Sequence, residues 1–361
     1  MVTKSEQIST KGAEEKDIAK ERMLTIQEAY REALFEEMSR DSTIFCLGED
    51  IGRYGGVHGQ TKGLWEKFGD DRVRDTPISE GAIIGAAIGA AATGMRPVAE
   101  IMYADFICAG GAMEQIVNQL AKIPYVGNGQ TKLPVTVMSA CGSRYPVVSN
   151  GPHHNQCFEG WFIHVPGLRV VTPSTPYDCK GLMKTILRSD DPTLIFLHRL
   201  LYYAKHRLVE SVYPSMVSYV PKEEYLIPLG KADVKRKGKD VTIVATMAMV
   251  HMALKAAESL EKDGINAEVV DPRTLVPLDK QTIVDSVKKT GRAVVASADA
   301  TTGGVAAELL SVIVEGAFDY LDAPVRRVSA LDLPISYNHA MEGAVLPSVE
   351  QIVVAAKEVV A

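Results

Sequence analysis

The fold is decided by residues 76–106, TPISEGAIIGAAIGAAATGMRPVAEIMYADF. Residues 81–92 carry no charge and predict a helix, although this apolar run is shorter than the roughly 18 residues that a membrane span needs. Within it, Gly81, Gly85 and Gly89 recur every four residues and therefore share one helical face. Because glycine has no side chain, this face predicts close approach of another backbone.

Glu80 stands at the first turn of this helix, directly after Ser79. Taken alone, the pair has an ordinary explanation, with Ser79 as the N-cap and Glu80 interacting with the helix dipole. Gly94 and Pro97 end the helix, and residues 98–103 predict a short strand. A catalytic role for Glu80 therefore depends on what the rest of the chain places beside it.

Length, charge and cysteine content limit the classes of protein to which this chain can belong. The chain has 361 residues, of which 46% are hydrophobic, so it can build the cores of two ordinary domains. The formal net charge of −6 provides no basic surface for a nucleic acid. The five cysteines are odd in number and include no Cys-x-x-Cys pair, a pattern typical of the reducing cytoplasm, where we expect the protein to act.

The order of apolar and polar segments predicts two α/β domains in series, each with a mostly parallel sheet and helices on both faces. We expect a mobile N-terminal tail at 1–22, a first domain at 23–205, a proline-interrupted linker at 206–229 and a second domain at 230–361. The predicted strands are 43–47, 98–103, 135–139, 168–171, 193–197, 240–245, 267–270 and 293–296. The predicted helices are 26–39, 81–92, 109–122, 177–188, 250–262, 280–289, 304–317 and 349–360.

A loop histidine is the second candidate for chemistry. His154 follows the predicted strand 135–139, at the edge of a parallel sheet where ligands commonly bind, and can exchange protons near neutral pH. A surface histidine bonded to backbone explains it equally well. His153 and His154 lack a second cluster at ligand spacing, so the sequence predicts no metal site. Gly303-Gly304 before a helix could hold an anion, but packing of helix on strand is the simpler explanation.

Many short motifs along the chain resemble one family. They include GED (48–50), TKGL (61–64), TPISE (76–80), TGMRPVAEIMYADF (93–106), EQIVNQLAK (114–122), DPRTLVPLD (271–279) and TTGG (301–304). Together with HHNQCFEGWFIHVPGLRVVTPSTPYDCKGL (153–182), they resemble the β subunit of the thiamine-diphosphate-dependent first component of 2-oxo acid dehydrogenase complexes. The pyruvate, acetoin and branched-chain members share these motifs. The resemblance implies a thiamine pyrimidine-binding domain followed by a transketolase C-terminal-like domain.

The resemblance also implies a function. Such a subunit is an oxidoreductase that decarboxylates a 2-oxo acid and transfers the acyl group to lipoamide, active only with a separate α subunit in an α2β2 heterotetramer. Its cofactors are thiamine diphosphate and magnesium, the latter held mainly by the α subunit. A lipoyl-bearing acyltransferase is a further implied partner. Asp263-Gly264 and Asn266 lack the spacing of the diphosphate-binding motif, which agrees with a separate α subunit.

Four residues take roles from the resemblance. Glu80 matches the glutamate that exchanges a proton with the cofactor's aminopyrimidine ring, and Phe106 matches the residue that flanks this ring. Met102 matches a residue lining the pocket. His154 matches the histidine that assists decarboxylation or acyl transfer. Without the resemblance, Met102 and Phe106 are ordinary core residues.

Departures from the family pattern concern substrate choice. The loop 141–153 is longer than usual, which leaves the role of Arg144 open, and Asn155 stands where the family has serine. Leu197 and Ser297-Ala298 replace acidic or histidine residues. The alternatives are an acetoin dehydrogenase β subunit, a transketolase-like two-carbon ketol transferase, a noncatalytic scaffold subunit and a flavodoxin-like redox module.

Overall fold

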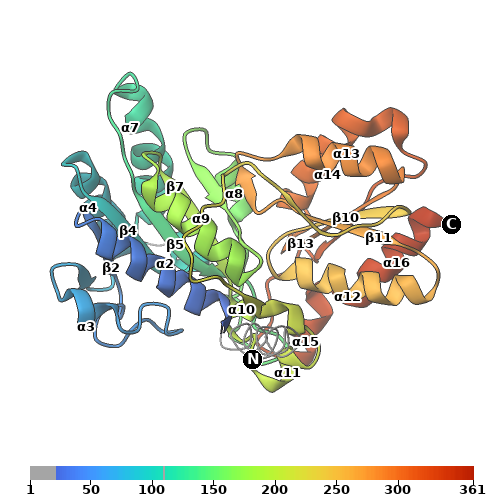
Figure 1. Cartoon of the computed structure of the whole chain (residues 1–361), viewed down its shortest axis with the longest axis horizontal. Helices are drawn as coiled ribbons and strands as arrows, with labels where there is room; N and C mark the ends of the chain where they lie inside the picture. The colour runs from blue at the N-terminus through green and yellow to red at the C-terminus, as the bar shows by residue number, and fades with distance from the viewer. Residues whose placement is uncertain (1–21, 109) are drawn as a thin grey trace, which may run out of the picture.

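The computed structural model describes residues 22–108 and 110–361. The predicted N-terminal tail lies outside these residues except for Arg22. The Arg22 guanidinium donates to the Glu32 carboxylate at 2.8 Å and to the backbone oxygen of Val220 at 2.9 Å. Two α/β units lie side by side, one built on the first half of the chain and the other on the second (Figure 1).

The first unit is built on a seven-stranded sheet in the order β12-β6-β7-β5-β4-β2-β3. Its strands are β2 (Ile44–Gly48), β3 (Val73–Asp75), β4 (Arg96–Tyr103), β5 (Thr136–Cys141), β6 (Arg169–Val171), β7 (Thr193–His198) and β12 (Thr274–Val276). All neighbours are parallel except β12, which is antiparallel to β6. The central strands are buried throughout, as expected of a parallel sheet covered on both faces.

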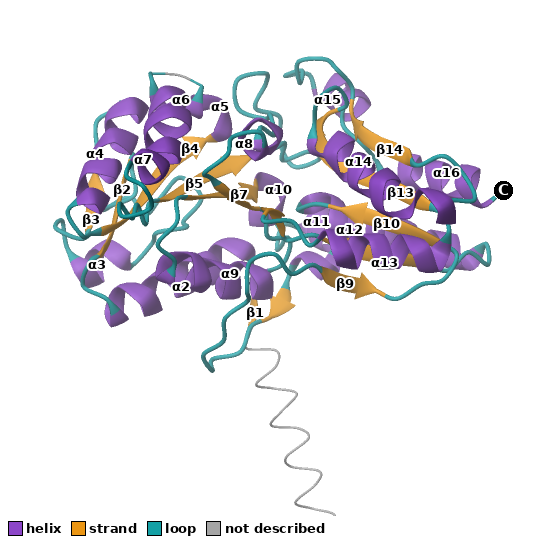
Figure 2. Ribbon diagram, turned by 90° about the horizontal axis from the view of Figure 1, so that it is seen from above, coloured by secondary structure: helices purple, strands orange, loops and turns teal. Residues whose placement is uncertain are grey.

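Helices cover both faces of this sheet (Figure 2). Alternate residues point to opposite sides, so that Ile44 and Cys46 face one core and Phe45 and Leu47 the other. The first core is closed by α2 (Ile26–Arg40), α3 (Leu64–Phe68) and α9 (Pro176–Arg188). The second is closed by α4 (Glu80–Ala92), α5 (Ala104–Ile107), α6 (Ala112–Glu114), a π-helix (Gln115–Leu120), α7 (Ala121–Val126) and α8 (Glu159–Ile163).

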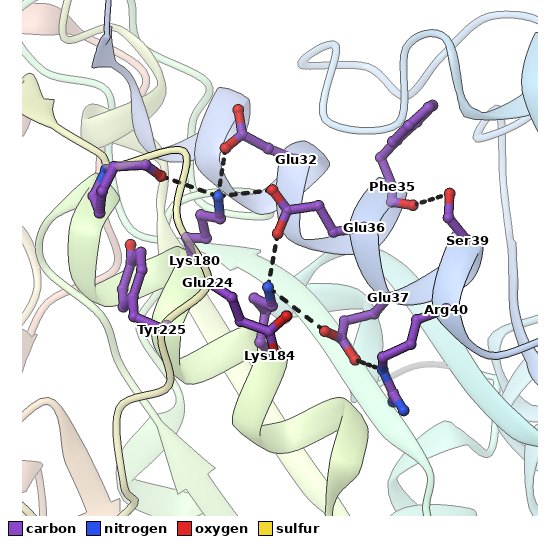
Figure 3. A network of polar contacts seen from close by, with 12 residues as sticks. Glu32, Phe35, Glu36, Glu37, Ser39, Arg40, Lys180, Lys184, Glu224 and Tyr225 are labelled. Carbon is purple, nitrogen blue, oxygen red and sulfur yellow. Dashed lines mark hydrogen bonds and ion pairs between the residues drawn. The ribbon is translucent and has the colours of Figure 1, made fainter.

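An ionic network joins α2 to α9 (Figure 3). Lys180 is fully buried, and its ammonium group lies 2.6 Å from Glu32 and 2.8 Å from Glu36. Lys184 pairs with the other oxygen of Glu36 at 2.8 Å. Because these lysine heads are out of water, each needs its carboxylate partner to offset the cost of burial. The network therefore fixes how α9 sits against α2.

The second unit is a five-stranded sheet in the order β14-β13-β10-β11-β9. Its strands are β9 (Asp233–Arg236), β10 (Val241–Ala245), β11 (Ala267–Asp271), β13 (Ala293–Ala300) and β14 (Arg326–Ala330), with β9 antiparallel to β11. One face is covered by α12 (Ala248–Lys262) and α16 (Val349–Val360), and the other by α13 (Lys280–Thr290) and α14 (Val305–Ala317). A 3-10 turn (Phe318–Tyr320) and α15 (His339–Val345) complete the unit.

Shorter elements tie the two units together. The segment after β7 holds α10 (Arg199–Tyr202), α11 (Arg207–Glu210), a 3-10 turn (Pro214–Met216) and β8 (Ser218–Tyr219), which pairs with β1 (Met23–Leu24). The strand β12 leaves the second unit to extend the first sheet. The core beneath α4 is also continuous with the core beneath α13 and α14. The two units are therefore packed against each other through a shared apolar interior.

The structure bears on two predictions for single segments, the helix at 109–122 and the glycine pair at 303–304. The predicted helix 109–122 is a succession of α6, a π-helix and α7 that ends at Val126, with Ala109 outside the described residues. Gly304 is the N-cap of α14, and a Cβ there would meet the backbone oxygen of Ala300 at 2.3 Å. The Asp299 carboxylate already accepts from the N–H of Val305, so packing and capping account for the glycine pair without an anion.

In the described part of the chain, no helix combines the length and the apolar character required to cross a lipid bilayer.

Candidate active site

The predicted site residues lie at the carboxyl edge of the first sheet. Parallel strands end at the same edge, which is where open α/β sheets bind ligands. Glu49 follows β2, Phe106 follows β4, the loop 142–156 follows β5, and Arg199 follows β7. Since β2, β4, β5 and β7 are consecutive neighbours in the sheet, these groups converge.

The start of α4 places Glu80 at this edge. Ser79 occupies the N-cap position, but its side chain makes no capping hydrogen bond, and Glu80 is only 8% exposed. A Cβ at Gly81 would lie 2.2 Å from the backbone oxygen of Gly110. The turn at Gly110 therefore packs directly on α4 beside the carboxylate, and only a glycine at residue 81 allows this approach.

The glycine face is thus explained in part by packing within the chain. A Cβ at Gly85 would meet the side-chain oxygen of Gln115 at 3.5 Å, an ordinary contact. A Cβ at Gly89 would have no atom of the described residues within 4 Å. The predicted backbone partner is confirmed at Gly81, whereas Gly89 faces open space in this chain.

A second carboxylate lies close to Glu80. Burial raises the pKa of Glu49 above its usual range, and the negative charges of Glu80 and Asp50 raise it further. The negative charge of Glu80 therefore favours the protonated form of Glu49.

Aromatic rings connect Phe106 to His154. The His154 ring lies edge-on to Phe106 at 5.4 Å and to Tyr103 at 5.1 Å between ring centres. Met102, at the end of β4, and Phe106 are both half-buried. Thus Phe106 and His154, which are distant in sequence, are in contact at the edge that also carries Glu80.

His154 is a neutral base in this setting. Burial lowers its pKa below the usual histidine value, and the positive charge of Arg199 lowers it further. Its Nδ1 atom is buried and has no hydrogen-bond partner among the described residues. A buried polar atom without a partner is uncommon and marks a place where a ligand atom can complete the bonding.

The backbone beside His154 is held by Arg199, whose side chain is fully buried. One Arg199 nitrogen donates to the backbone oxygen of His154 and, at 3.1 Å, to the Oδ1 atom of Asn155. The other donates to Asn150 at 2.9 Å. Arg144 shares the same Asn150 oxygen, with its Nε at 2.9 Å, and reaches the Tyr203 hydroxyl. Arg144 therefore helps to order the loop, although its predicted role was open.

The second unit braces the same loop through Glu342, at α15. This carboxylate is buried and accepts from the hydroxyl groups of Ser143 and Ser149 and, at 3.2 Å, from the side-chain N–H of Asn155. Asn155 therefore connects Arg199 on one side with Glu342 on the other. A serine hydroxyl would offer its donor and its acceptor on one atom of a shorter side chain, whereas the Asn155 amide offers them on two separate atoms.

Sequence reasoning missed several members of the site. The His58 ring packs in a tilted arrangement against Tyr202 at 4.8 Å between ring centres, and burial lowers the pKa of His58 to about 3. The carboxyl group of Asp105, adjacent to Phe106, has a pKa raised by burial to about 6. Arg199 could have been found because it directly follows a predicted strand at the ligand-binding edge. For His58, in a glycine-rich loop, no sequence signal indicated the tyrosines around it.

The arrangement suits proton transfer in a dry, partly aromatic site. Glu80 and Glu49 provide neighbouring carboxyl groups, Phe106 offers an apolar face, and the neutral His154 can accept or donate a hydrogen bond. A heteroaromatic ring with polar nitrogens fits this donor set better than a bare metal ion does. A pocket of about 550 Å³ lies elsewhere, between α8, β12 and the start of α14, and Glu80, Phe106 and His154 do not line it.

Comparisons with known proteins agree with this geometry. Residues 22–205 match the family described as transketolase, pyrimidine binding domain, and residues 230–352 match the transketolase C-terminal domain. The 2-oxoisovalerate dehydrogenase subunit beta of Bacillus subtilis is 44% identical over 327 residues, which cover 90% of this chain and 95% of that protein.

Two further relatives have other names. The mitochondrial pyruvate dehydrogenase E1 component subunit beta-1 of rice is 42% identical, covering 92% of this chain and 86% of its own length. The acetoin:2,6-dichlorophenolindophenol oxidoreductase subunit beta of Cupriavidus necator is 41% identical, covering 93% and 97% respectively.

A solved structure shares the whole fold. The split-gene transketolase described as an inactive beta4 tetramer superposes with a TM-score of 0.70 and 26% identity, covering 93% of this chain and 98% of that one. The predicted fold class is therefore confirmed. The chain belongs to the transketolase-like β subunits of the first component of thiamine-dependent 2-oxo acid dehydrogenase complexes.

Proposed function

We propose that this chain supplies the carboxylate and aromatic half of a thiamine diphosphate site. In this proposal it acts only with an α subunit, decarboxylates a 2-oxo acid and passes the acyl group to lipoamide. One observation carries the proposal: Glu80 is nearly buried at the first turn of α4, at the sheet edge where Phe106 meets His154. The domain limits 23–205 and 230–361 are part of the proposal, with 206–229 as the connection.

Glu80 has the central chemical role in this proposal. Bound thiamine diphosphate supplies the nucleophile and the electron sink for decarboxylation. The Glu80 carboxyl exchanges a proton with the outer ring nitrogen of the aminopyrimidine, and Glu49 tunes this exchange through its charge. Phe106 flanks the aminopyrimidine ring and Met102 lines the pocket. The low exposure of Glu80 keeps water from competing for its proton.

His154 acts on the substrate side in this proposal. Because its pKa is lowered by burial and by Arg199, His154 is neutral at physiological pH and can donate one hydrogen bond and accept another. It orients the 2-oxo acid during decarboxylation or the incoming acyl acceptor afterwards. Arg199 fixes the backbone that carries it.

Partner subunits are part of the proposal because this chain supplies only half of the cofactor site. An α subunit would hold the diphosphate and most of the magnesium coordination in an α2β2 heterotetramer, and a lipoyl-bearing acyltransferase would take the product. All five cysteines are free thiols, which suits a reducing compartment such as the cytoplasm.

The test is reconstitution with the α subunit. We expect thiamine-diphosphate-dependent dye reduction with 2-oxoisovalerate, pyruvate or acetoin only when both chains are present. Glu80→Gln should lower turnover at least about 10²-fold, because it removes a positioned acid–base group. Glu66→Gln is the matched control, since Glu66 is exposed in the first turn of α3. Full activity of the isolated chain, or normal turnover of Glu80→Gln, would refute the proposal.

A ketol transferase remains the second candidate, because the fold also matches a split-gene transketolase. The same reconstituted protein distinguishes the two. Transfer of a two-carbon unit between sugar phosphates, without dye reduction by any 2-oxo acid or by acetoin, would favour the transferase. A complex that binds thiamine diphosphate but performs neither reaction would point to a noncatalytic scaffold.

A further inference from the structure

Two thiols and a carboxylate meet where the loop 142–156 begins and ends. Cys141 is the last residue of β5, and Cys157 and Glu159 follow the loop at the start of α8. The two Sγ atoms and a carboxylate oxygen of Glu159 all lie within 4.8 Å of one another. The thioether sulfur of Met247, at the N-cap of α12, lies 3.8 Å from the Cys141 sulfur. Groups from both α/β units therefore surround this point.

Glu159 distinguishes this cluster from ordinary buried cysteines. Its side chain is 0% exposed, and neither carboxylate oxygen has a hydrogen-bond partner among residues 22–108 and 110–361. An ionised carboxylate buried without a partner costs several kcal/mol, so the group must be either protonated or bound to a cation.

Asp299 adds negative charge beside this cluster, but its own carboxylate already has hydrogen-bond partners. Its carboxylate accepts from the hydroxyl group of Ser297 and from the backbone N–H of Val305, so it already has partners. Two buried carboxyl groups therefore face two thiols, and no lysine or arginine pairs with Glu159 among the described residues. The local field favours a cation.

The donor set selects the kind of cation. Sulfur ligands combined with one carboxylate suit Zn²⁺, whereas magnesium and calcium prefer sites made entirely of oxygen. Three anionic ligands around a divalent ion leave a net charge of −1. Because zinc binds thiolate and carboxylate groups, binding releases protons and weakens as pH falls.

We propose that Cys141, Cys157 and Glu159 bind one zinc ion that closes the base of the loop 142–156. We expect the ion to act on the loop and not on the substrate, because the three ligands lie outside the residues assigned to the cofactor and Cys141 and Glu159 are fully buried. It holds together the two ends of the loop that carries Asn150 and His154, beside the backbone hydrogen bond from Gly142 to Gln156 at 3.0 Å. Closing a loop in this way stabilises the folded state and orders its tip.

This proposal departs from the sequence-based expectation of no metal site. That expectation rested on the lack of a second ligand cluster beside His153 and His154 and of a Cys-x-x-Cys pair. Here the long loop separates the two cysteines along the chain, and the fold returns the second beside the first. The third ligand is a glutamate in a motif that otherwise indicates only the family.

The test uses the full chain co-expressed with its α subunit and purified under reducing conditions without chelator. Elemental analysis should find about one zinc per β chain, as expected for a folded structural site. Each of the variants Cys141→Ser, Cys157→Ser and Glu159→Gln should lower the zinc content to below about a tenth of an equivalent per β chain. Cys179→Ser is the matched control, because Cys179 is equally buried in α9, outside the cluster.

Spectroscopy keeps the proposal testable even if a variant fails to fold. In the wild-type complex, cobalt exchanged into the site should give a thiolate-to-metal charge-transfer band, which an oxygen-ligated cobalt in the α subunit cannot give. X-ray absorption of the zinc form should show sulfur at about 2.3 Å. Less than about a tenth of an equivalent of zinc together with no charge-transfer band would overturn the proposal. So would a disulfide between Cys141 and Cys157 in the freshly purified protein.

Discussion

Replacing Gly81 with alanine tests whether the close contact between α4 and the Gly110 turn sets the position of Glu80. The added Cβ would lie 2.2 Å from the Gly110 backbone oxygen, well below the 3.0 Å that real Cβ contacts respect. Backbone cannot rotate away as a side chain can, so α4 and the turn must separate by the better part of an ångström. Glu80 is the adjacent residue and must move with the helix.

The expected change in the free energy of unfolding of Gly81→Ala is the difference between two opposing effects. Alanine is favoured over glycine in a helix by about 1 kcal/mol, while overpacking a well-packed contact costs about 1–3 kcal/mol. We therefore expect Gly81→Ala to lower the free energy of unfolding by about 1 kcal/mol. A misplacement of this size beside a reacting group typically costs about 10²-fold in rate. Turnover should thus fall far more than stability does.

Two glycines on the same helix are matched controls. Gly85→Ala adds an ordinary contact with Gln115, and Gly89→Ala meets no atom of the described residues within 4 Å. Both variants should therefore gain part of the stability that alanine adds to a helix. The assay is chemical unfolding of each variant, together with thiamine diphosphate affinity and turnover of the reconstituted complex. If Gly81→Ala were as stable as Gly85→Ala and kept normal turnover, the contact with Gly110 would not position Glu80.

Three further predictions concern the loop, the pH dependence and the ionic network. Arg199→Met should lower turnover about tenfold or more through misplacement of His154, with partial rescue by Arg199→Lys; unchanged turnover in the Met variant would exclude this positioning role. Burial raises the pKa of Glu100 from 4.5 to about 8, so the stability that comes from its neutral form is complete below pH 4.5 and is lost as pH rises to 8. In urea unfolding, the free energy of unfolding should fall less steeply with rising pH in Glu100→Gln than in the wild type, by up to about 1.4 kcal/mol per pH unit. An identical slope in the two proteins would contradict this role of Glu100. Lys180→Met should lower the free energy of unfolding by about 1–3 kcal/mol in the same assay. Lys205→Met, which removes an exposed ion pair, should lower it by less than about 0.5 kcal/mol. Equal losses would mean that burial of Lys180 is unimportant.

Much of the fold could be predicted because its central strands are continuous apolar runs. Strands such as β5 and β7 are buried on both faces, so most of their residues are hydrophobic and the pattern is clear in the sequence. The edge strands of the two sheets, β3, β9, β12 and β14, were not predicted. The sequence of β9, DVKR, is polar, and the three residues of β12 are strand only because β6 in the other unit offers an unpaired edge. Pairing of this kind depends on tertiary structure.

The site could be predicted only where a motif carried it. Glu80, Phe106 and His154 came from the family resemblance, and the structure brings Phe106 and His154 into contact. His58 and Glu159 could not be found this way, because what distinguishes each is the partners it has or lacks once buried. Periodicity predicts which residues are buried, but it does not predict which buried polar atoms remain without a partner.

The two proposed acid–base groups depend on different parts of the molecule. Glu80 is fixed by α4 and the Gly110 turn, both within the first unit. The loop that carries His154 is fixed by two buried charges of opposite sign, Arg199 from the first unit and Glu342 from the second, which meet at the two ends of the Asn155 amide. A change in how the second unit packs would therefore move His154 relative to Glu80 without disturbing α4. We therefore expect changes in this loop to alter the choice of substrate while leaving the proposed proton exchange at Glu80 in place.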